Sequence, residues 1–251
     1  MAPCLALCPA VAPLPLASTG ATVRLILFDI DGTLIHSGGA GLRSLRKVFH
    51  EMFDLEDAVE GIAFHGRTDP AIVREIAKKC LGPDPDDARM AEITKRYLVH
   101  LQEFLRDPPG YQVLSGAHSL VADLAEDPAV VLGLATGNYE VAAYAKLRPG
   151  QLDGFFDLGG FGSDSESRPE LTRIAVSRGR ERAGAAVPVV VVGDTIHDVH
   201  AAHEAGARCL AVATGNASME TLEEAGADWT VPTLEDPRAR EVLELASFHS
   251  R

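Results

Sequence analysis

The sequence predicts a doubly wound α/β fold, with a mostly parallel, Rossmann-like sheet, helices on both of its faces and an inserted all-helical module. Three observations carry this prediction. Short β-branched apolar runs without polar alternation indicate strands that are buried on both faces. Segments with helical spacing of apolar residues separate these runs, and such alternation is typical of a parallel sheet. One stretch, residues 38–110, breaks the alternation with helical patterns alone.

The composition fits an ordinary globular protein. The chain has 251 residues, of which 46% are apolar and 24% charged, so it can bury one large core, or one core and a smaller module. A formal net charge of −13 argues against nucleic acid or an anionic membrane as the main partner. It leaves room for a small anionic substrate, because a bound divalent cation can reverse the local field.

The amino-terminal segment and the cysteines carry no functional signal. Residues 1–22 are rich in alanine, proline and leucine and uncharged, and we expect a disordered tail there. Their apolar run is interrupted by prolines, lacks the basic residues of a targeting segment and is too short to span a bilayer. The cysteines, which show no paired metal-site spacing, favour a reduced, cytoplasmic setting without structural zinc: Cys4, Cys8, Cys80 and Cys209.

Five apolar runs are the predicted strands, and they lie at residues 24–29, 130–136, 156–160, 189–194 and 209–214. Helical stripes follow some of them, as at Leu120, Val121 and Leu124 and again at Leu171, Ile174 and Ala175. Ligands of such sheets bind outside the carboxyl ends of the strands. Polar residues stand at three of these ends: Asp29, Thr136 and Asp194. We therefore expect these three to meet in one site.

The segment that breaks the alternation is predicted to be a helical cap, residues 38–110, inserted into a core formed by residues 23–37 and 111–251. Apolar residues recur at helical spacing around residues 42–52, 72–80 and 93–105. Asp69 and Pro70 are a suitable N-cap and first-turn pair for the second of these helices.

The run Asp29-Ile30-Asp31-Gly32-Thr33-Leu34 places two acids two residues apart at the end of a buried strand. Packing gives no reason for this arrangement, because desolvating carboxylates is costly. A Mg²⁺ ion and a phosphate ester would give one. The run resembles the first motif of the haloacid dehalogenase-like superfamily, most of whose members are phosphatases.

Three further segments match that superfamily in order and spacing. The segment Leu134-Ala135-Thr136-Gly137-Asn138 resembles its second motif, Arg168 lies where the third motif carries a basic residue, and Gly193-Asp194-Thr195-Ile196-His197-Asp198 resembles the fourth. The resemblance covers residues 24–235, and the insert matches the helical cap of the family. The relatives that the chain resembles most are phosphoglycolate phosphatases and β-phosphoglucomutases.

The resemblance implies a role for each acid. Asp29 would attack phosphorus and form an aspartyl phosphate, which splits one difficult displacement into two steps. Mg²⁺ would be held by the Asp29 and Asp194 carboxylates and the main-chain carbonyl of Asp31. The Asp31 side chain would protonate the leaving oxygen and later accept a proton from water. Asp198, four residues after Asp194, would hold a metal-bound water or would cap a helix.

The phosphoryl group and the substrate would meet other residues. Thr136 and the amides after it would hold phosphoryl oxygens, with Gly137 permitting close approach of the backbone. The Asn138 amide would reach the phosphate or cap the following helix. Arg168 departs from the usual lysine of the family; arginine can supply the charge, and whether it makes lysine's contact with the nucleophile is open.

Two residues of the insert are candidates for substrate binding, because the segment Phe64-His65-Gly66-Arg67-Thr68-Asp69 resembles the cap loop that enters the site in related enzymes. His65 would hydrogen-bond the substrate. Arg67 would bind a carboxylate or second anionic group of the substrate, or would form an ion pair within the cap; both alternatives stay open.

The sequence thus predicts a Mg²⁺-dependent phosphatase that hydrolyses a small phosphorylated metabolite through a phosphorylated Asp29. A phosphomutase of the β-phosphoglucomutase type is the nearest alternative, because it would use the same nucleophile and acid. A dehalogenase fits less well, since carbon–halogen cleavage gains nothing from Asp31. A response-regulator receiver and a catalytically silent binding module are further alternatives; the insert after Asp29 argues against the first and the intact set of acids against the second.

Overall fold

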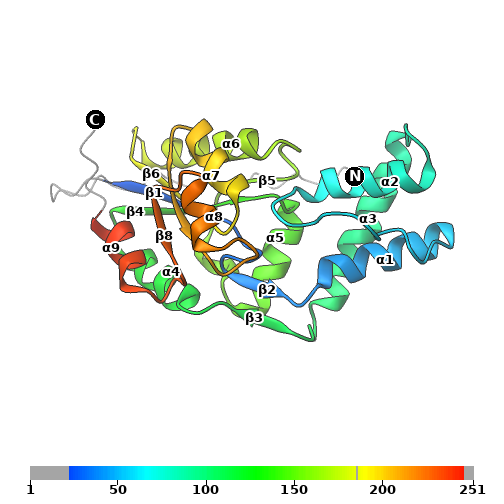
Figure 1. Ribbon diagram of the computed structural model, residues 1–251, viewed down its shortest axis with the longest axis horizontal. Coiled ribbons are helices and arrows are strands. Elements are labelled where there is room, and N and C mark those ends of the chain that lie inside the picture. Colours follow the sequence, from blue (N-terminus) through cyan, green and yellow to red (C-terminus); the bar gives the residue numbers. More distant parts are fainter. Residues whose placement is uncertain (1–22, 185, 246–251) are drawn as a thin grey trace, which may run out of the picture.

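A computed structural model describes residues 23–184 and 186–245, and the expected tail at residues 1–22 lies outside the described residues. Within them, a six-stranded parallel sheet has the order β5-β4-β1-β6-β7-β8 (Figure 1). Its strands are β1 (Arg24–Phe28), β4 (Val130–Thr136), β5 (Gly159–Phe161), β6 (Val189–Gly193), β7 (Arg208–Val212) and β8 (Trp229–Val231). The predicted α/β class is confirmed.

Helices cover both faces of this sheet. They are α4 (Ala117–Glu126), α5 (Glu140–Leu147), α6 (Arg168–Ala183), α7 (Ile196–Glu204), α8 (Met219–Glu224) and α9 (Pro237–Leu245). The alternation along β1 shows why two layers are needed: Leu25 and Leu27 pack in a core with α6, α7 and α8, while Ile26 and Phe28 pack in a second core with α4, α5 and α9. A strand that is apolar at every position is therefore buried on both faces.

The insert forms a separate helical layer at one end of the sheet (Figure 1). Its helices are α1 (Ala40–Phe53), α2 (Asp69–Leu81) and α3 (Asp87–Phe104), and they share an apolar core that includes Phe49, Ile76 and Leu101. The N-cap of α2 is Thr68, whose side chain accepts from the amide of Ala71, and Asp69 is already the first helical residue. The sequence placed this cap one residue too late.

A two-stranded antiparallel ribbon joins the insert to the core. It consists of β2 (Ile35–Ser37) and β3 (Tyr111–Val113), and it pairs the chain entering the insert with the chain leaving it. Short 3₁₀ turns, η1 (Arg148–Gly150) and η2 (Asp153–Phe155), follow α5. The ribbon was not predicted, because three-residue strands give too few positions for a pattern.

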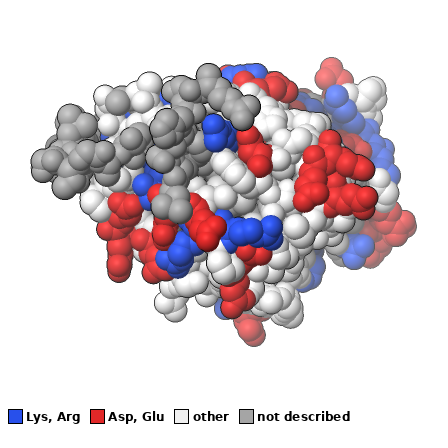
Figure 2. All heavy atoms as spheres, turned by 60° about the vertical axis from the view of Figure 1, so that its left-hand side comes forward, with Lys and Arg blue, Asp and Glu red and all other residues white. Residues whose placement is uncertain are grey.

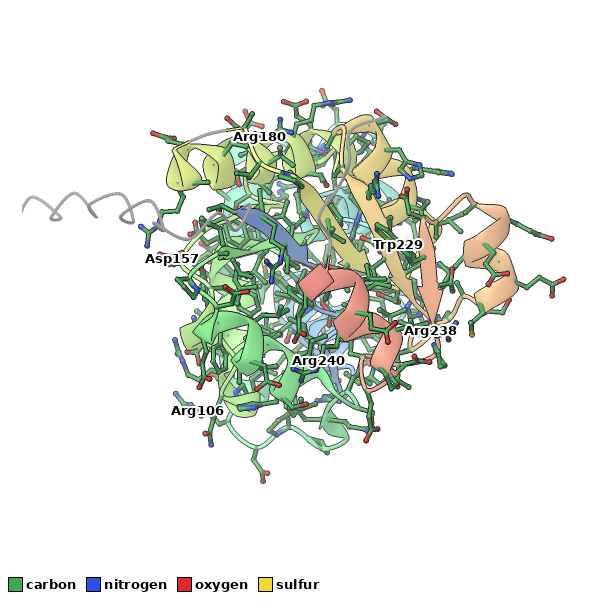
Figure 3. All side chains as sticks on the ribbon, turned by 90° about the vertical axis from the view of Figure 1, so that its left-hand side faces the viewer. Arg106, Asp157, Arg180, Trp229, Arg238 and Arg240 are labelled. Atoms are coloured by element: carbon green, nitrogen blue, oxygen red, sulfur yellow. The ribbon has the colours of Figure 1, made fainter. Side chains whose placement is uncertain are left out.

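Charged side chains lie on the outside of α9, at the end of the molecule away from the insert. Figure 3 looks onto this end and shows Arg240 on α9, where it pairs with Asp123 of α4 and Glu244 of its own helix. Acidic and basic side chains are intermingled on the face shown in Figure 2. No helix among the described residues combines the length and apolarity that a membrane crossing requires.

Candidate active site

The site lies at the carboxyl ends of three neighbouring strands. Asp29 follows β1, Thr136 ends β4 and Asp194 follows β6, and β1 pairs with both of the other strands. This strand order brings the carboxyl ends of three strands, far apart in the sequence, to one edge of the sheet, so the three residues meet there as predicted. They line a cavity of about 520 Å³ together with residues of the insert.

The first part of the site is a group of four charged side chains, which we call the Arg168 cluster: Asp29, Asp194, Asp198 and Arg168. All four are buried. The guanidinium of Arg168 lies 2.7 Å from Asp29 Oδ2 and donates to Asp198 Oδ1 at 2.5 and 2.9 Å. Arginine at this position therefore does contact the carboxylate of Asp29, and it is held in place by a second carboxylate.

The carboxylates of the Arg168 cluster repel one another in a dry setting. Burial, together with the nearby Asp198, raises the pKa of Asp29 to about 6, although Arg168 opposes this shift. Burial and the charges of Asp198 and Asp29 raise the pKa of Asp194 to about 8. Three carboxylates facing one guanidinium give the fully ionised cluster a formal charge of −2, which a divalent cation would neutralise.

The donor set of this cluster fits a hard divalent cation. Asp29, Asp194 and Asp198 each offer a carboxylate oxygen, and the three oxygens lie within 4.8 Å of one another. Carboxylate oxygens are the ligands that Mg²⁺ prefers. Two glycines leave room for the Asp194 carboxylate. A Cβ on Gly215 would lie 1.7 Å from Asp194 Oδ2, and one on Gly32 would lie 2.4 Å from the same oxygen. The site thus has the chemistry that the predicted metal requires.

The side chain of Asp198 has two further contacts. It accepts from the amide and hydroxyl of Thr195, at 3.0 and 2.6 Å, and Thr195 in return caps its amide. This capping box begins α7, so the helix-capping alternative is observed. Asp198 nevertheless stays within the acidic group, and its Oδ1 atom anchors Arg168.

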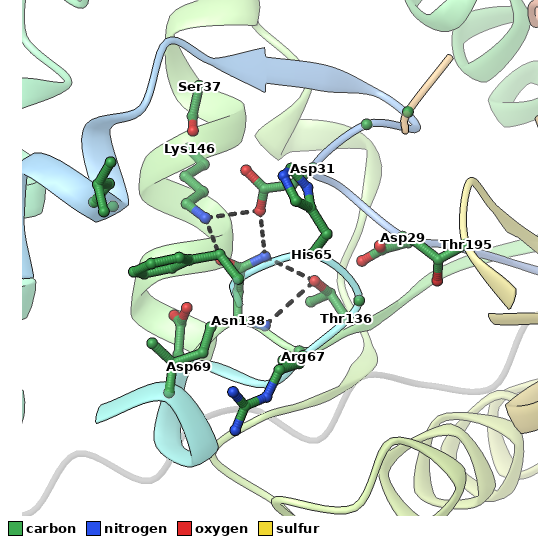
Figure 4. A pocket seen from close by; sticks show the side chains of 18 of the residues that line it. Asp29, Asp31, Ser37, His65, Arg67, Asp69, Thr136, Asn138, Lys146 and Thr195 are labelled. Atoms are coloured by element: carbon green, nitrogen blue, oxygen red, sulfur yellow. Dashed lines mark hydrogen bonds and ion pairs between the residues drawn. The ribbon is translucent and has the colours of Figure 1, made fainter. Parts of the chain in front are cut away.

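The second part of the site is the Lys146 cluster, which consists of Asp31, Asn138 and Lys146. Lys146 Nζ lies 2.7 Å from Asp31 Oδ2 and 2.5 Å from Asn138 Oδ1. The Asn138 amide donates to Asp31 Oδ2 at 2.9 Å and to Thr136 Oγ1 at 2.8 Å. Figure 4 shows this network beside Thr136, with Asp29 on the other side of that threonine.

The charges of the Lys146 cluster balance. Burial alone would raise the pKa of Asp31, but Lys146, Asn138 and Ser37 together lower it below its ordinary value. Burial alone would lower the pKa of Lys146, and Asp31 and Asp69 raise it instead. The resting protein therefore holds this pair ionised, whereas the Arg168 cluster carries more carboxylates than cations.

Asn138 does not cap the following helix, which was one of the two alternatives for it. Its side chain is used within the Lys146 cluster, and the N-cap position of α5 belongs to Tyr139. Gly137 permits a close approach, but the backbone that approaches belongs to the insert: a Cβ on Gly137 would lie 2.5 Å from the carbonyl oxygen of Arg67. The amide of Asp69 also donates to the Gly137 carbonyl at 2.7 Å.

The loop of residues 64–69 docks on the core beside the site. Arg67 pairs with Glu75 of α2 and donates to the carbonyl of Ala63 at 3.2 Å, so the ion pair within the insert is the alternative that the structure contains. His65 is exposed and lines the cavity, over the site in Figure 4. Arg168 donates to the Gly66 carbonyl at 3.4 Å, which links the loop to the Arg168 cluster.

Lys146, Asp69 and Tyr97 line the cavity, and none of the three was predicted to be a site residue. Burial raises the pKa of Asp69 and of Tyr97, and the two side chains hydrogen-bond. A signal for Lys146 does exist. Lys146 is the one lysine of α5, and its neighbours in that helix are small or apolar and fully buried: Ala142, Ala143 and Leu147. A charge in such a helix needs a partner.

Comparisons with known proteins agree with this geometry. A family model for haloacid dehalogenase-like hydrolases matches residues 26–212. The chain is 27% identical over 236 residues to a probable phosphatase, IndB, of Dickeya dadantii, covering 89% of this chain and 96% of that protein. It is 29% identical over 213 residues to a phosphoglycolate phosphatase of Rhodospirillum rubrum, covering 81% and 85%.

Solved structures show the same fold. CbbY from Rhodobacter sphaeroides, in complex with phosphate, has a TM-score of 0.65 at 21% identity, covering 85% of this chain and 96% of that one. A putative β-phosphoglucomutase from Bacteroides vulgatus has a TM-score of 0.63 at 20% identity, covering 92% and 93%. With the family model spanning the strands that carry Asp29, Thr136 and Asp194, the chain belongs to the haloacid dehalogenase-like hydrolase family.

Proposed function

We propose that this hydrolase is a Mg²⁺-dependent phosphoric monoester hydrolase that acts on a small phosphorylated metabolite. The observation that carries the proposal is the convergence of the Arg168 and Lys146 clusters on one cavity, with Asp29 and Asp31 two residues apart. One cluster supplies a carboxylate beside a cation, and the other supplies a second carboxyl with fixed partners. The phosphatases among its relatives support the same reaction class.

Asp29 is the nucleophile in this proposal. Its carboxylate oxygen forms a bond to phosphorus while the bond between phosphorus and the leaving oxygen breaks, and the leaving oxygen takes the bond's electron pair and the proton of Asp31. Arg168, 2.7 Å from Asp29, keeps this carboxylate in place and lowers its repulsion toward a phosphate dianion. Thr136 and the amide of Gly137 bind phosphoryl oxygens.

Asp31 is the acid and then the base. A phosphate dianion bound beside Asp31 opposes the charge of Lys146 and so favours the proton on Asp31 before the first step. In the second step water attacks phosphorus, gives a proton to the Asp31 carboxylate, and the Asp29–phosphorus bond breaks to release phosphate. Both steps together consume one water and restore both carboxyl groups.

The metal belongs to the Arg168 cluster. The Asp29 and Asp194 carboxylates and the main-chain carbonyl of Asp31 would hold Mg²⁺, with Asp198 in its outer shell. When bound, the ion supplies positive charge that screens the repulsion between the Asp29 carboxylate and the phosphate oxygens.

The insert sets the size of the substrate. Residues of α1 and of the loop at residues 64–69 line the same cavity as Asp29, and the loop is hydrogen-bonded to the core. A cavity of about 520 Å³ holds a metabolite and excludes a folded phosphoprotein. His65 lies where it can hydrogen-bond the substrate, whereas the charge of Arg67 is paired with Glu75. A cytoplasmic setting stays a prediction, consistent with free Cys80 and Cys209.

The experiment is a screen of phosphorylated metabolites, including phosphoglycolate and sugar phosphates, for Mg²⁺-dependent release of free phosphate. We expect Asp29→Asn to lower kcat by about 10⁴-fold or more, because a nucleophile is lost. Asp84→Asn, at an exposed loop position, is the matched control and should keep full activity. Both variants should show wild-type circular dichroism.

Other outcomes identify other functions. Isomerisation of a sugar phosphate without phosphate release would identify a mutase. Full activity of Asp29→Asn would contradict the assignment of the nucleophile.

A further inference from the structure

Lys146 is a cation inside the site that none of the predicted steps uses. Its side chain is 7% exposed, and a buried ammonium is costly unless it is paired. The helix α5 lies between the two parts of the protein: Ala143 and Leu147 pack toward the sheet, and Ala142 and Ala145 pack toward the insert. This packing leaves Lys146 aimed at the cavity, where Figure 4 shows it beside Asp31 and Asn138.

Lys146 and Asn138 converge on one atom. Lys146 Nζ lies 2.7 Å from Asp31 Oδ2, and the Asn138 amide lies 2.9 Å from the same oxygen. Lys146 also fixes Asn138 itself through the Oδ1 atom at 2.5 Å. Two donors on one carboxylate oxygen set the rotation of the whole group, and with it the direction in which the other oxygen points.

We propose that Lys146 is a positioning residue that orients the Asp31 carboxyl toward the leaving oxygen. The inference rests on the proposed function, in which Asp31 gives its proton to that oxygen as the ester bond breaks. The Asp31 side chain is 40% exposed toward the cavity, so packing alone does not fix it. A misplacement of about 1 Å in a reacting group can cost about 100-fold in rate, and Lys146 prevents such a misplacement.

The test compares two leaving groups. An alkyl ester such as phosphoglycolate has a poor leaving group that needs the proton of Asp31, whereas the nitrophenolate of p-nitrophenyl phosphate leaves without one. The parameter is kcat/KM, because it reports steps up to the first irreversible one and excludes the later hydrolysis shared by both esters. The wild type is first screened so that an alkyl ester it hydrolyses is used.

We expect Lys146→Met to lower kcat/KM for the alkyl ester by about 100-fold, and for p-nitrophenyl phosphate by less than about tenfold. Lys146→Arg retains the charge and the donors. It should restore most of the wild-type ratio of kcat/KM for the alkyl ester to kcat/KM for p-nitrophenyl phosphate. Lys47→Met is the matched control, because Lys47 forms an exposed ion pair with Glu103 in the insert and lies outside the cavity lining; it should change neither value.

The ratio of the two kcat/KM values is measured on one preparation, so it does not depend on the folded fraction. Should Lys146→Met fail to fold, Lys146→Gln carries the same comparison. Equal losses on both esters, or no loss on either, would overturn the positioning role of Lys146. A wild type that releases phosphate from no ester at all would instead overturn the proposed function.

Discussion

Two buried cations flank the site, and they meet carboxylates in different surroundings. Arg168 contacts Asp29 and Asp198, whose side chains are 7% and 1% exposed, whereas Lys146 contacts Asp31, whose side chain is 40% exposed. The Arg168 cluster has three carboxylates for one cation, and the Lys146 cluster has one for one. The difference teaches that the first cluster needs its arginine to offset buried negative charge, while the second needs its lysine mainly for orientation.

Replacing each cation in turn tests this comparison. The loss in the free energy of unfolding on removal of Arg168 is the largest effect on stability that we expect. Arg168→Met leaves two buried carboxylates without a cationic partner, which costs about 3 kcal/mol in the free energy of unfolding. Lys146→Met leaves a carboxylate that water can reach, and should cost about 1 kcal/mol or less. Urea unfolding in EDTA measures both values. Equal losses in the two variants would contradict the distinction.

The activity of Arg168→Met sharpens the same point. We expect kcat/KM to fall by at least about 100-fold for both an alkyl ester and p-nitrophenyl phosphate, because the Asp29 carboxylate loses its fixed partner in either reaction. Lys146→Met, by contrast, should discriminate between the two esters. If Arg168→Met lowered kcat/KM for one ester much more than for the other, the proposed difference between the roles of Arg168 and Lys146 would be contradicted.

The charge imbalance of the Arg168 cluster predicts a pH-dependent response to metal. In the folded, metal-free protein Asp194 and Asp29 have pKa values of about 8 and about 6. In the unfolded chain the same carboxyl groups lose their protons near the ordinary pKa of 3.8. These two groups therefore favour the metal-free folded state at low pH, and their contribution is lost as pH rises through about 6 and then about 8.

Because Mg²⁺ must displace those protons, its affinity should rise between pH 6 and pH 8.5, approaching about tenfold per pH unit for one displaced proton. Thermal unfolding with and without Mg²⁺ measures the effect, and the stabilisation should be larger at pH 8.5. Asp194→Asn should abolish the Mg²⁺-dependent shift. A stabilisation that is independent of pH would argue that the acids are already ionised without metal.

The smallest effect is expected at Arg67, a third cation on the cavity. Its charge is paired with Glu75 within the insert, so Arg67→Ala should change kcat/KM for phosphoglycolate by less than about threefold, in line with the roughly 0.5 kcal/mol of a part-exposed ion pair. Lys78→Ala, on the same helix as Glu75, is the control for loss of a cation from α2. A loss of 100-fold on carboxylate-bearing esters alone would return Arg67 to the substrate.

The strand ends could be predicted from the sequence, and with them half of the site. The runs that became β1, β4 and β6 are long and apolar enough to show a buried parallel sheet, and they place Asp29, Thr136 and Asp194 without further information. The run predicted at residues 156–160 is shifted: β5 covers Gly159–Phe161, because Phe156 packs in the core without joining the sheet. The strand β8 (Trp229–Val231) was missed because three residues carry no period.

The Lys146 cluster could not be predicted from the motifs, because it depends on how a helix packs. Lys146 reaches Asp31 across 115 positions of the chain only once α5 has settled between the sheet and the insert. For the same reason the motif did not predict that the Asn138 side chain bonds to Asp31 and Thr136. Motifs locate residues on strands, and helix packing decides the remaining neighbours.

The narrow ribbon of β2 and β3 offers a place to shorten this chain. Ser37 and Tyr111 are paired neighbours across it, so a two-residue turn could join them and omit everything between. The sheet and both acids of the first motif would keep their connections in such a shortened protein. Such a deletion would remove the residues of α1 and of the loop at residues 64–69 from the lining of the cavity, whereas Asp29, Asp31 and Asp194 would remain.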